Sequence, residues 1–294
     1  MNRRHILGSL LGSFFLFPVA LFAKNANAAD PWLDRPLTLP SLHLSADVGL
    51  GFGQYANGAN SDGTTKHSLG SGSNLEAAVG VPILGEVGVR TGVRFGDGGK
   101  ASGADSYGRL FDKETVGQGP ATFANPEIFL RGTLIDVKVV AVGLETRFVL
   151  PLASDTEVGG VKINDSYFSW VPGLPVRIRI PQLARIDTGI YIPFQFAEKT
   201  IYAVDVPVNL WFAAGDAFFG PLVGFRFSHV PAPTDVGDSD NRGDIRLGFG
   251  GGYTVAGFID LKAQIYANSI NHSPEGSSWT NTIGFGLGAG INIP

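Results

Sequence analysis

Apolar and polar residues alternate with a period of two along most of this chain. In residues 175–196 the sequence reads PVRIRIPQLARIDTGIYIPFQF, two alternating runs on either side of the short turn PQLA. Side chains of a β-strand point to opposite faces in turn, so one face of this hairpin is apolar and the other is polar. Arg177, Arg179 and Asp187 all fall on the polar face. If Ile180 pairs with Ile186 across the turn, we expect Arg179 to lie opposite Asp187.

The same alternation recurs from residue 42 onward, and no helical period of comparable length is found. It predicts about twelve strands, near residues 42–52, 74–81, 87–95, 127–131, 140–150, 175–180, 186–196, 202–212, 219–228, 245–253, 259–266 and 279–293. Short connections follow the even-numbered strands, and long ones follow the odd-numbered strands with the exception of the seventh. This sorting of connections is typical of a barrel that crosses a membrane.

The charged residues decide between two folds. A soluble sandwich buries the apolar face of its strands, whereas a membrane barrel turns that face to lipid. Nine basic and seven acidic residues share the polar face, and the opposite face is rich in Ile, Val and Phe with no helix in the chain to cover it. We therefore predict an all-β fold, a transmembrane up-and-down antiparallel β-barrel of about 12 strands. A secreted soluble β-protein is the alternative.

The first residues have the form of an export signal. Residues 1–28 combine a basic start, an apolar run and the small-residue ending Ala-Asn-Ala, which predicts a cleaved signal peptide. Without its three basic residues the chain keeps 19 basic and 26 acidic residues, a formal charge of −7, so we expect no nucleic-acid partner. The chain has no cysteine, which excludes disulfides and thiol chemistry.

Two further parts are expected after the signal peptide. Residues 29–41 are rich in proline and predict an extended segment, because proline lacks the N–H that a central strand needs. This segment either lies at the barrel mouth or folds into the barrel. Residues 42–294 are predicted to form a single transmembrane barrel domain.

Several stretches resemble a known class of proteins. The signal peptide, the stretch RPLTLP at residues 35–40, and the paired stretches NPEIFLRGTLI and VGLETRFVLPLAS are similar to bacterial outer-membrane β-barrels of the porin-like or transporter-like kind. The resemblance covers nearly all of the chain after the signal peptide. It implies a location in the bacterial outer membrane, reached by export through the signal peptide.

The polar face of such a barrel lines its lumen. The charged residues that we expect to face solutes or ions are Arg90, Arg94, Arg131, Glu145, Arg147, Arg177, Arg179, Asp187, Asp205, Arg226, Arg246 and Lys262. Two interpretations remain open: the arginines line a water-filled passage that favours anions, or they form structural ion pairs with neighbouring acids. Twelve strands lie between the roughly eight that side chains fill and the roughly sixteen that leave a channel.

Other kinds of site are not supported. The glycines between Gly284 and Gly290 are spaced by two on one strand face, and no helix follows, as a nucleotide-binding loop requires. A structural role explains these glycines better: without side chains they make the inner wall thinner, or they ease the curvature of the strand. Asp238 and Asp240 match part of a calcium loop, but Arg242 stands where a ligand is needed. We expect no metal and no cofactor.

An enzymatic function is also not expected. Twelve-stranded outer-membrane phospholipases carry a histidine and a serine two residues apart on a strand, whereas here His229 is followed by Val230 and Pro231. The predicted function is a channel or transporter for small solutes. The alternative is a structural or surface-interaction barrel with a plugged lumen and partner-binding external loops. The predicted partners are outer-membrane lipid and small solutes or ions, and the barrel is predicted to be a monomer.

Overall fold

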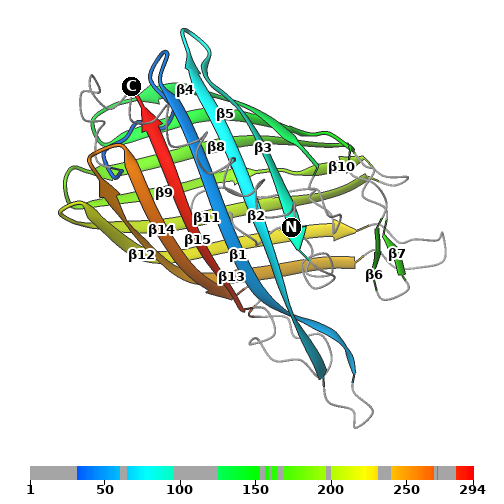
Figure 1. Cartoon of the computed structure of the whole chain (residues 1–294). Coiled ribbons are helices and arrows are strands. Elements are labelled where there is room, and N and C mark those ends of the chain that lie inside the picture. Colours follow the sequence, from blue (N-terminus) through cyan, green and yellow to red (C-terminus); the bar gives the residue numbers. More distant parts are fainter. Residues whose placement is uncertain are drawn as a thin grey trace, which may run out of the picture.

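The alternating runs form one large antiparallel sheet that closes into a barrel (Figure 1). The structure is a computed structural model and describes residues 32–59, 65–95, 125–152, 156–158, 161–163, 168–196, 200–230, 240–267, 270 and 283–294. The barrel strands are β1 (Leu44–Ala59), β2 (Thr65–Val81), β3 (Gly85–Phe95), β4 (Glu127–Asp136), β5 (Val140–Val149), β8 (Ser169–Ile180), β9 (Ala184–Tyr191), β10 (Phe194–Phe196), β11 (Thr200–Ala214), β12 (Ala217–Val230), β13 (Asp240–Val255), β14 (Ile259–Ala267) and β15 (Ile283–Ile293). A separate small hairpin consists of β6 (Thr156–Val158) and β7 (Val161–Ile163).

The ring has twelve strand positions, as predicted. β9 and β10 share one position, because both pair with β8 on one side and β11 on the other, in the same register. Pro193 lies in the break between them and has no N–H for a ladder hydrogen bond. The ring closes where the first and last strands pair, from Leu44 opposite Ile293 to Gly53 opposite Gly284. Closure leaves no open sheet edge.

Some strands are longer than the alternation predicts. β1 and β2 continue through residues 55–59 and 65–73, and β8 begins at Ser169 rather than Pro175. In β1 and β2 the alternation predicts loops there, because polar and glycine residues replace the apolar ones while backbone pairing continues. The added part of β8 is the stretch SWVPGL, in which Pro172 and Gly173 interrupt the pattern. The predicted signal peptide lies outside the described residues. In the described part of the chain, no helix is long and apolar enough to cross a membrane.

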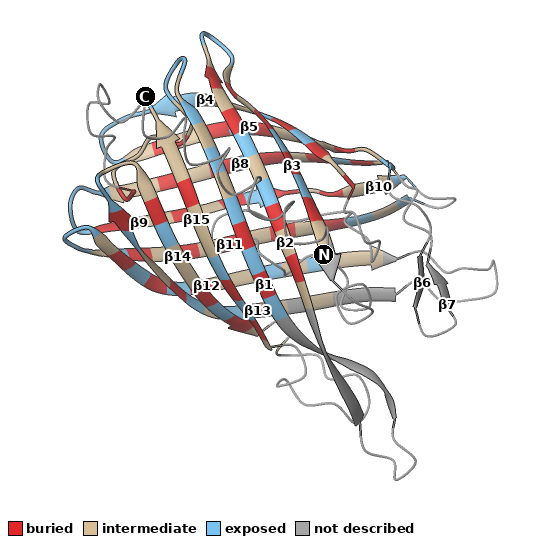
Figure 2. Cartoon of the chain, viewed as in Figure 1, coloured by how far each residue is buried: buried red, intermediate tan, exposed pale blue. Residues whose placement is uncertain are grey.

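The outer surface of the barrel is apolar. Leu50, Leu144 and Ile190 on three different strands are each about half exposed, and their strand neighbours are buried. Buried residues alternate with more exposed ones along several barrel strands in Figure 2. Outward-facing aromatic side chains gather at two levels. Phe212 and Phe219 pack together next to the β11–β12 turn, with ring centroids 6.2 Å apart. A second group stands at the opposite end of the barrel and includes Phe148, Phe168, Trp170, Phe194 and Tyr202.

An apolar belt between two aromatic levels is the exterior of a barrel that lies in an outer membrane. The turns at one end are short, for example residues 82–84 and 181–183. We call this the short-turn end. The Phe212 level lies near it.

On the inner surface, glycines make room for aromatic rings. Phe129 lies over its cross-strand partner Gly88, where an added Cβ would stand 2.2 Å from the ring. Tyr266 covers Gly284 in the same way. Each ring fills the space above a residue that has no side chain, so the wall stays packed where a strand contains glycine. The glycines predicted to thin the inner wall thus also provide the space in which these rings lie.

Candidate functional site in the barrel lumen

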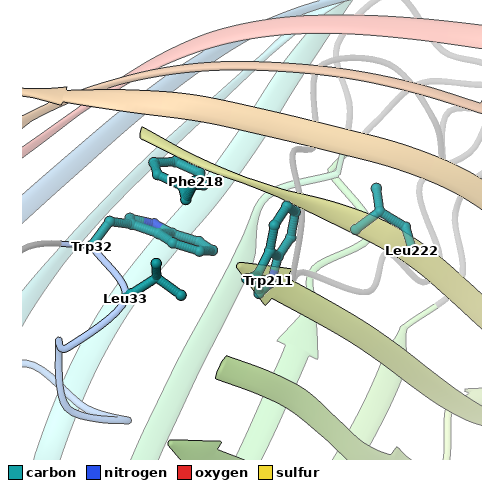
Figure 3. Close-up of a cluster of buried hydrophobic side chains, with 5 residues drawn as sticks. All are labelled: Trp32, Leu33, Trp211, Phe218 and Leu222. Atoms are coloured by element: carbon teal, nitrogen blue, oxygen red, sulfur yellow. The ribbon is translucent and has the colours of Figure 1, made fainter. Parts of the chain in front are cut away.

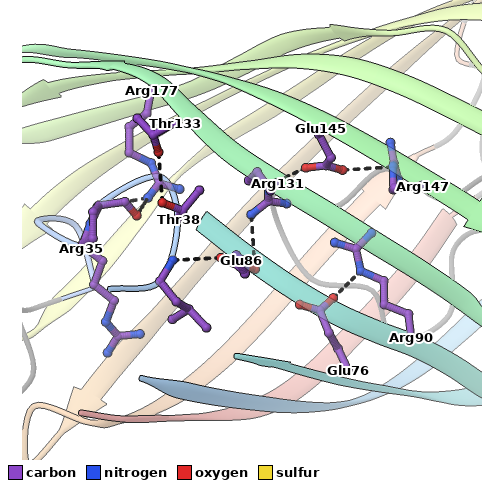
Figure 4. A network of polar contacts seen from close by, with 12 residues as sticks. Arg35, Thr38, Glu76, Glu86, Arg90, Arg131, Thr133, Glu145, Arg147 and Arg177 are labelled. Carbon is purple, nitrogen blue, oxygen red and sulfur yellow. Dashed lines mark hydrogen bonds and ion pairs between the residues drawn. The ribbon is translucent and has the colours of Figure 1, made fainter. Parts of the chain in front are cut away.

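One half of the inner wall carries a cluster of buried charges, shown in Figure 4. We call it the Glu–Arg cluster; its members lie on β2–β5 and are Glu76, Glu86, Arg90, Glu127, Arg131, Glu145 and Arg147. Arg90 bonds Glu76 and donates from Nη1 to Glu127 Oε1 at 2.7 Å. Glu145 accepts from Arg131 Nε at 2.5 Å.

Glu145 also forms an ion pair with Arg147 at 3.0 Å, and both side chains are at most 2% exposed. Aromatic rings support the same arginines. The Arg90 guanidinium lies 4.4 Å from the centre of the Phe129 ring, and that of Arg147 lies 4.9 Å from Tyr191. A ring contact is weaker than a buried ion pair, so the carboxylates are the main partners of these arginines. Every member of the cluster lies on a wall strand, and the cluster is therefore part of the wall itself.

A second structure occupies the lumen near the short-turn end. Residues 32–40, which we call the N-terminal segment, lie inside the barrel ahead of β1. Trp32 stacks on Phe218 with ring centroids 4.2 Å apart and meets Trp211 edge-on at 5.1 Å (Figure 3). Leu33 and Leu222 complete this buried apolar group. Of the two placements left open for residues 29–41, at the barrel mouth or inside the barrel, the described residues 32–40 have the second.

Two wall arginines bind the backbone of the N-terminal segment. Arg177 Nη1 donates to the carbonyl of Arg35 at 3.0 Å and to that of Pro36 at 2.6 Å. Arg185 donates to the carbonyl of Trp32, and its guanidinium lies 3.5 Å from the centre of the indole ring. Asp187 lies between the two arginines and accepts from Arg177 at 2.6 Å and from Arg185 at 2.7 Å.

The far end of the N-terminal segment is bound by β2, β3 and β4. The hydroxyls of Thr38 and Thr133 are 3.0 Å apart, and the Leu39 amide donates to Glu86 Oε2 at 3.0 Å (Figure 4). The Pro40 carbonyl lies so close to Gly80 that a Cβ there would be 1.8 Å from its oxygen. Only glycine fits at that position, because the obstacle is backbone rather than a movable side chain.

A further contact reaches the opposite side of the ring. The Arg35 guanidinium forms a two-pronged ion pair with Asp260 on β14, with Nη2 to Oδ1 at 3.0 Å. Asp260 also accepts from the Thr254 hydroxyl at 2.9 Å. Beside it, Lys262 bonds Asp47 at 2.5 Å. These charges line a cavity beside the N-terminal segment, and the rest of its wall comes from β1–β4, β8, β9, β14 and β15.

The structure separates the predicted lumen residues by partner. Arg90, Arg131, Glu145 and Arg147 come together in the Glu–Arg cluster. Arg177 and Asp187 hold the N-terminal segment, Lys262 pairs with Asp47, and Asp205 pairs with Arg226 at 2.6 and 2.8 Å. Arg246 lies 6.0 Å from the centre of the Tyr266 ring. Arg94 is in β3, but its side chain lies outside the described part.

The expected pairing of Arg179 with Asp187 is wrong. Arg177 is the residue opposite Asp187, and Arg179 lies opposite Arg185. The turn has three residues rather than four, since Gln182 adopts a left-handed φ of 62° and Ile180 pairs with Ala184. Arg179 instead bonds Asp136 and the Val137 carbonyl, at the rim of the short-turn end.

The residues predicted to face solutes do not include Arg35, Glu86 and Arg185, nor Asp47, Glu76, Glu127 and Asp260. Glu86 and Arg185 obey the period of two but lie one residue before the predicted starts of their strands, at Val87 and Ile186. The other four acids lie on the predicted polar face and not among the residues predicted to face solutes. The role of Arg35 carries no local signal, since its partner is 225 residues away.

Comparison with known proteins supports the fold. No protein-family model matches the chain, and no curated protein matches its sequence. The COG4313 outer membrane channel from Pseudomonas putida F1 aligns with a TM-score of 0.58 at 7% identity, covering 90% of this chain and 100% of that chain. The NanC porin aligns with a TM-score of 0.48 at 9% identity, covering 85% of this chain and 99% of that chain. The alignment with the COG4313 channel agrees with the closed antiparallel ring, and the chain has the predicted fold, that of a bacterial outer-membrane β-barrel.

Proposed function

We propose that the protein is an outer-membrane channel for small solutes whose passage is occupied, at the short-turn end, by its own N-terminal segment. The observation that carries this proposal is the way the lumen is filled. Wall side chains leave enough room for a separate stretch of chain and a polar cavity beside it. The segment is attached to the wall by individual hydrogen bonds, by the two-pronged Arg35–Asp260 ion pair and by the contacts of Trp32 with Trp211, Phe218 and Arg185. Residues 32–40 form no strand pairing with the wall.

Such attachments are reversible. Hydrogen bonds between polar groups contribute about 0.5–1.5 kcal/mol each, or about 1.5–3 kcal/mol where one group is charged, because water replaces the lost partner. A lumen lined by paired charges can be hydrated when the segment moves, whereas an apolar core could not. One protein with this fold is described as an outer membrane channel, which agrees with this function.

The channel is tested by recordings in planar bilayers. We expect small or rare conductance steps from the full chain and large, stable steps from a variant that lacks residues 32–39. Heat-modifiable migration in a detergent gel checks that the variant still forms a barrel. If neither protein conducts across a wide range of voltage although both are folded, the channel function is wrong.

A second candidate function is a closed barrel that acts through its external loops. It is favoured by the ion pairs of the Glu–Arg cluster, which occupy arginines that would otherwise meet solute. The same recordings separate the two candidates, since a closed barrel stays silent after the N-terminal segment is removed.

A further inference from the structure

The contacts of the N-terminal segment fall on two sides of the ring. Glu86, Thr133, Arg177 and Arg185 bind it from β3, β4, β8 and β9, which form one continuous arc together with β5. At its other end Trp32 and Leu33 pack on Trp211, Phe218 and Leu222 of β11 and β12, so these contacts run from β3 around to β12. Facing the remaining part of the ring, β14, β15 and β1 present a wall that includes Gly290, Asp47 and Lys262. A cavity separates the segment from this wall, and its lining also includes Glu86, Arg131, Arg177 and Arg185.

Arg35 crosses that cavity. Its carbonyl is held by Arg177 on β8, while its guanidinium binds Asp260 on β14. β8 and β14 are five positions apart in a ring of twelve, which places them almost opposite each other. One residue thus connects two nearly opposite sides of the barrel, through its backbone at one end and its side chain at the other.

The Arg35–Asp260 ion pair is buried and geometrically well matched. Arg35 and Asp260 side chains are 13% and 3% exposed, so water screens their attraction only weakly. The planar fork of arginine matches the two carboxylate oxygens, and the Thr254 hydroxyl fixes the carboxylate from behind. Asp260 is therefore positioned before Arg35 arrives.

We propose that the Arg35–Asp260 ion pair is the closing contact of the channel, a bar across the passage that remains beside the N-terminal segment. Breaking this single pair opens the passage while the segment stays bound to β3, β4, β8 and β9. The inference rests on the proposed channel function and adds a specific gate to it. It also predicts ion selectivity, since charged side chains at a narrow point select the ions that pass.

The test uses two substitutions of opposite charge effect in the full chain. Arg35→Ala leaves the Asp260 carboxylate without its arginine, so we expect a several-fold larger conductance with a reversal potential shifted toward cations. Asp260→Asn leaves the Arg35 guanidinium without its carboxylate, so we expect larger conductance with a shift toward anions. The Lys262–Asp47 pair is the same in both variants and cancels in the comparison. The double variant is expected to stay open and to lose most of either shift.

Arg226→Ala is the matched control. Arg226 and Asp205 form another two-pronged pair in the lumen, but they are direct cross-strand partners on β11 and β12 and span no gap. Removing Arg226 should leave conductance close to that of the unmodified chain. Heat-modifiable migration again confirms that each variant is a folded barrel.

The outcomes are distinct. Open variants with opposite selectivity shifts support the gate. Two open variants that shift in the same direction, or an equally open Arg226→Ala control, indicate general loosening and overturn it. If both single variants remain closed while the variant lacking residues 32–39 conducts, the gate is wrong and the channel stands. If that deletion variant is silent as well, the channel function fails too.

Discussion

The lumen contains two sets of buried arginines with different partners. Arg90 and Arg131 bind carboxylates on neighbouring wall strands, and Arg147 binds Glu145 on its own strand β5, all within the Glu–Arg cluster. Arg177 and Arg185 share Asp187, and each donates from Nη1 to carbonyls of the N-terminal segment. The same kind of side chain on the same face of the sheet therefore pairs with the wall in one place and holds the N-terminal segment in the other. The partner of each arginine distinguishes the two sets.

The largest effect is expected in the Glu–Arg cluster. Glu145→Ala removes the closest acid from both Arg131 and Arg147 and leaves two buried cations. Loss of one partner of a buried pair costs about 3–5 kcal/mol of unfolding free energy, because the remaining charge stays desolvated. Urea unfolding followed by gel migration measures this loss. Asp205→Ala serves as control, and should cost less because Arg226, with 29% of its side chain exposed, can reach water.

The second set should respond differently. Arg185→Ala removes the ring contact and the hydrogen bond to Trp32, while Asp187 keeps Arg177. We expect about 2–3 kcal/mol weaker attachment of the N-terminal segment, since a charged hydrogen bond and a desolvated cation–π contact are lost together. Limited proteolysis within residues 32–40 should accelerate while barrel migration is unchanged. If Arg185→Ala weakens the barrel as much as it weakens attachment of the N-terminal segment, the two sets of arginines do not differ in role.

A crosslink can sharpen the comparison without deleting any residue. Thr38 and Thr133 have hydroxyls 3.0 Å apart, and the chain contains no cysteine, so the pair Thr38→Cys and Thr133→Cys is the only thiol pair present. In the reduced protein only one hydroxyl hydrogen bond is lost, worth about 1 kcal/mol. Oxidation should suppress large conductance steps, and reductant should restore them. If the oxidised and reduced forms of this variant conduct equally, movement of this end of the segment does not open the channel.

The smallest effect is expected at the rim. Arg179 pairs with Asp136, whose side chain is 39% exposed, so water already competes for both groups. Arg179→Ala should change unfolding free energy by no more than about 0.5 kcal/mol and leave conductance unaltered. A large effect on either measurement would show that position on the polar face matters more than burial and partner.

Alternation was enough to predict the barrel but not its contacts. Parity correctly placed Arg90, Glu145 and Asp187 on the inner face, because every strand side chain must choose one of two faces. It could not choose their partners. Ile180 pairs with Ala184 rather than with Ile186, and this shift of two residues moves the partner of Asp187 from Arg179 to Arg177.

The place of the N-terminal segment and its Arg35–Asp260 contact could not be predicted from the local sequence, for a different reason. A proline-rich segment has no alternation, so its place in the lumen left no trace in the pattern. The meeting of Arg35 with Asp260 depends on closure of the whole ring, which brings together residues 225 positions apart. Glycine positions such as Gly80 were visible in the sequence, but their function became clear only beside the Pro40 carbonyl.

The seam between β1 and β15 has a consequence for assembly. The N-terminal segment leads directly into β1, and the Leu42 amide bonds the Gly80 carbonyl on β2 at 2.8 Å. The segment can therefore settle against β2, β3 and β4 while β1 and β15 are still apart. When the seam forms between Leu44 and Gly53 and the last strand, the segment is enclosed where it already lies. No chain end has to thread through a finished ring.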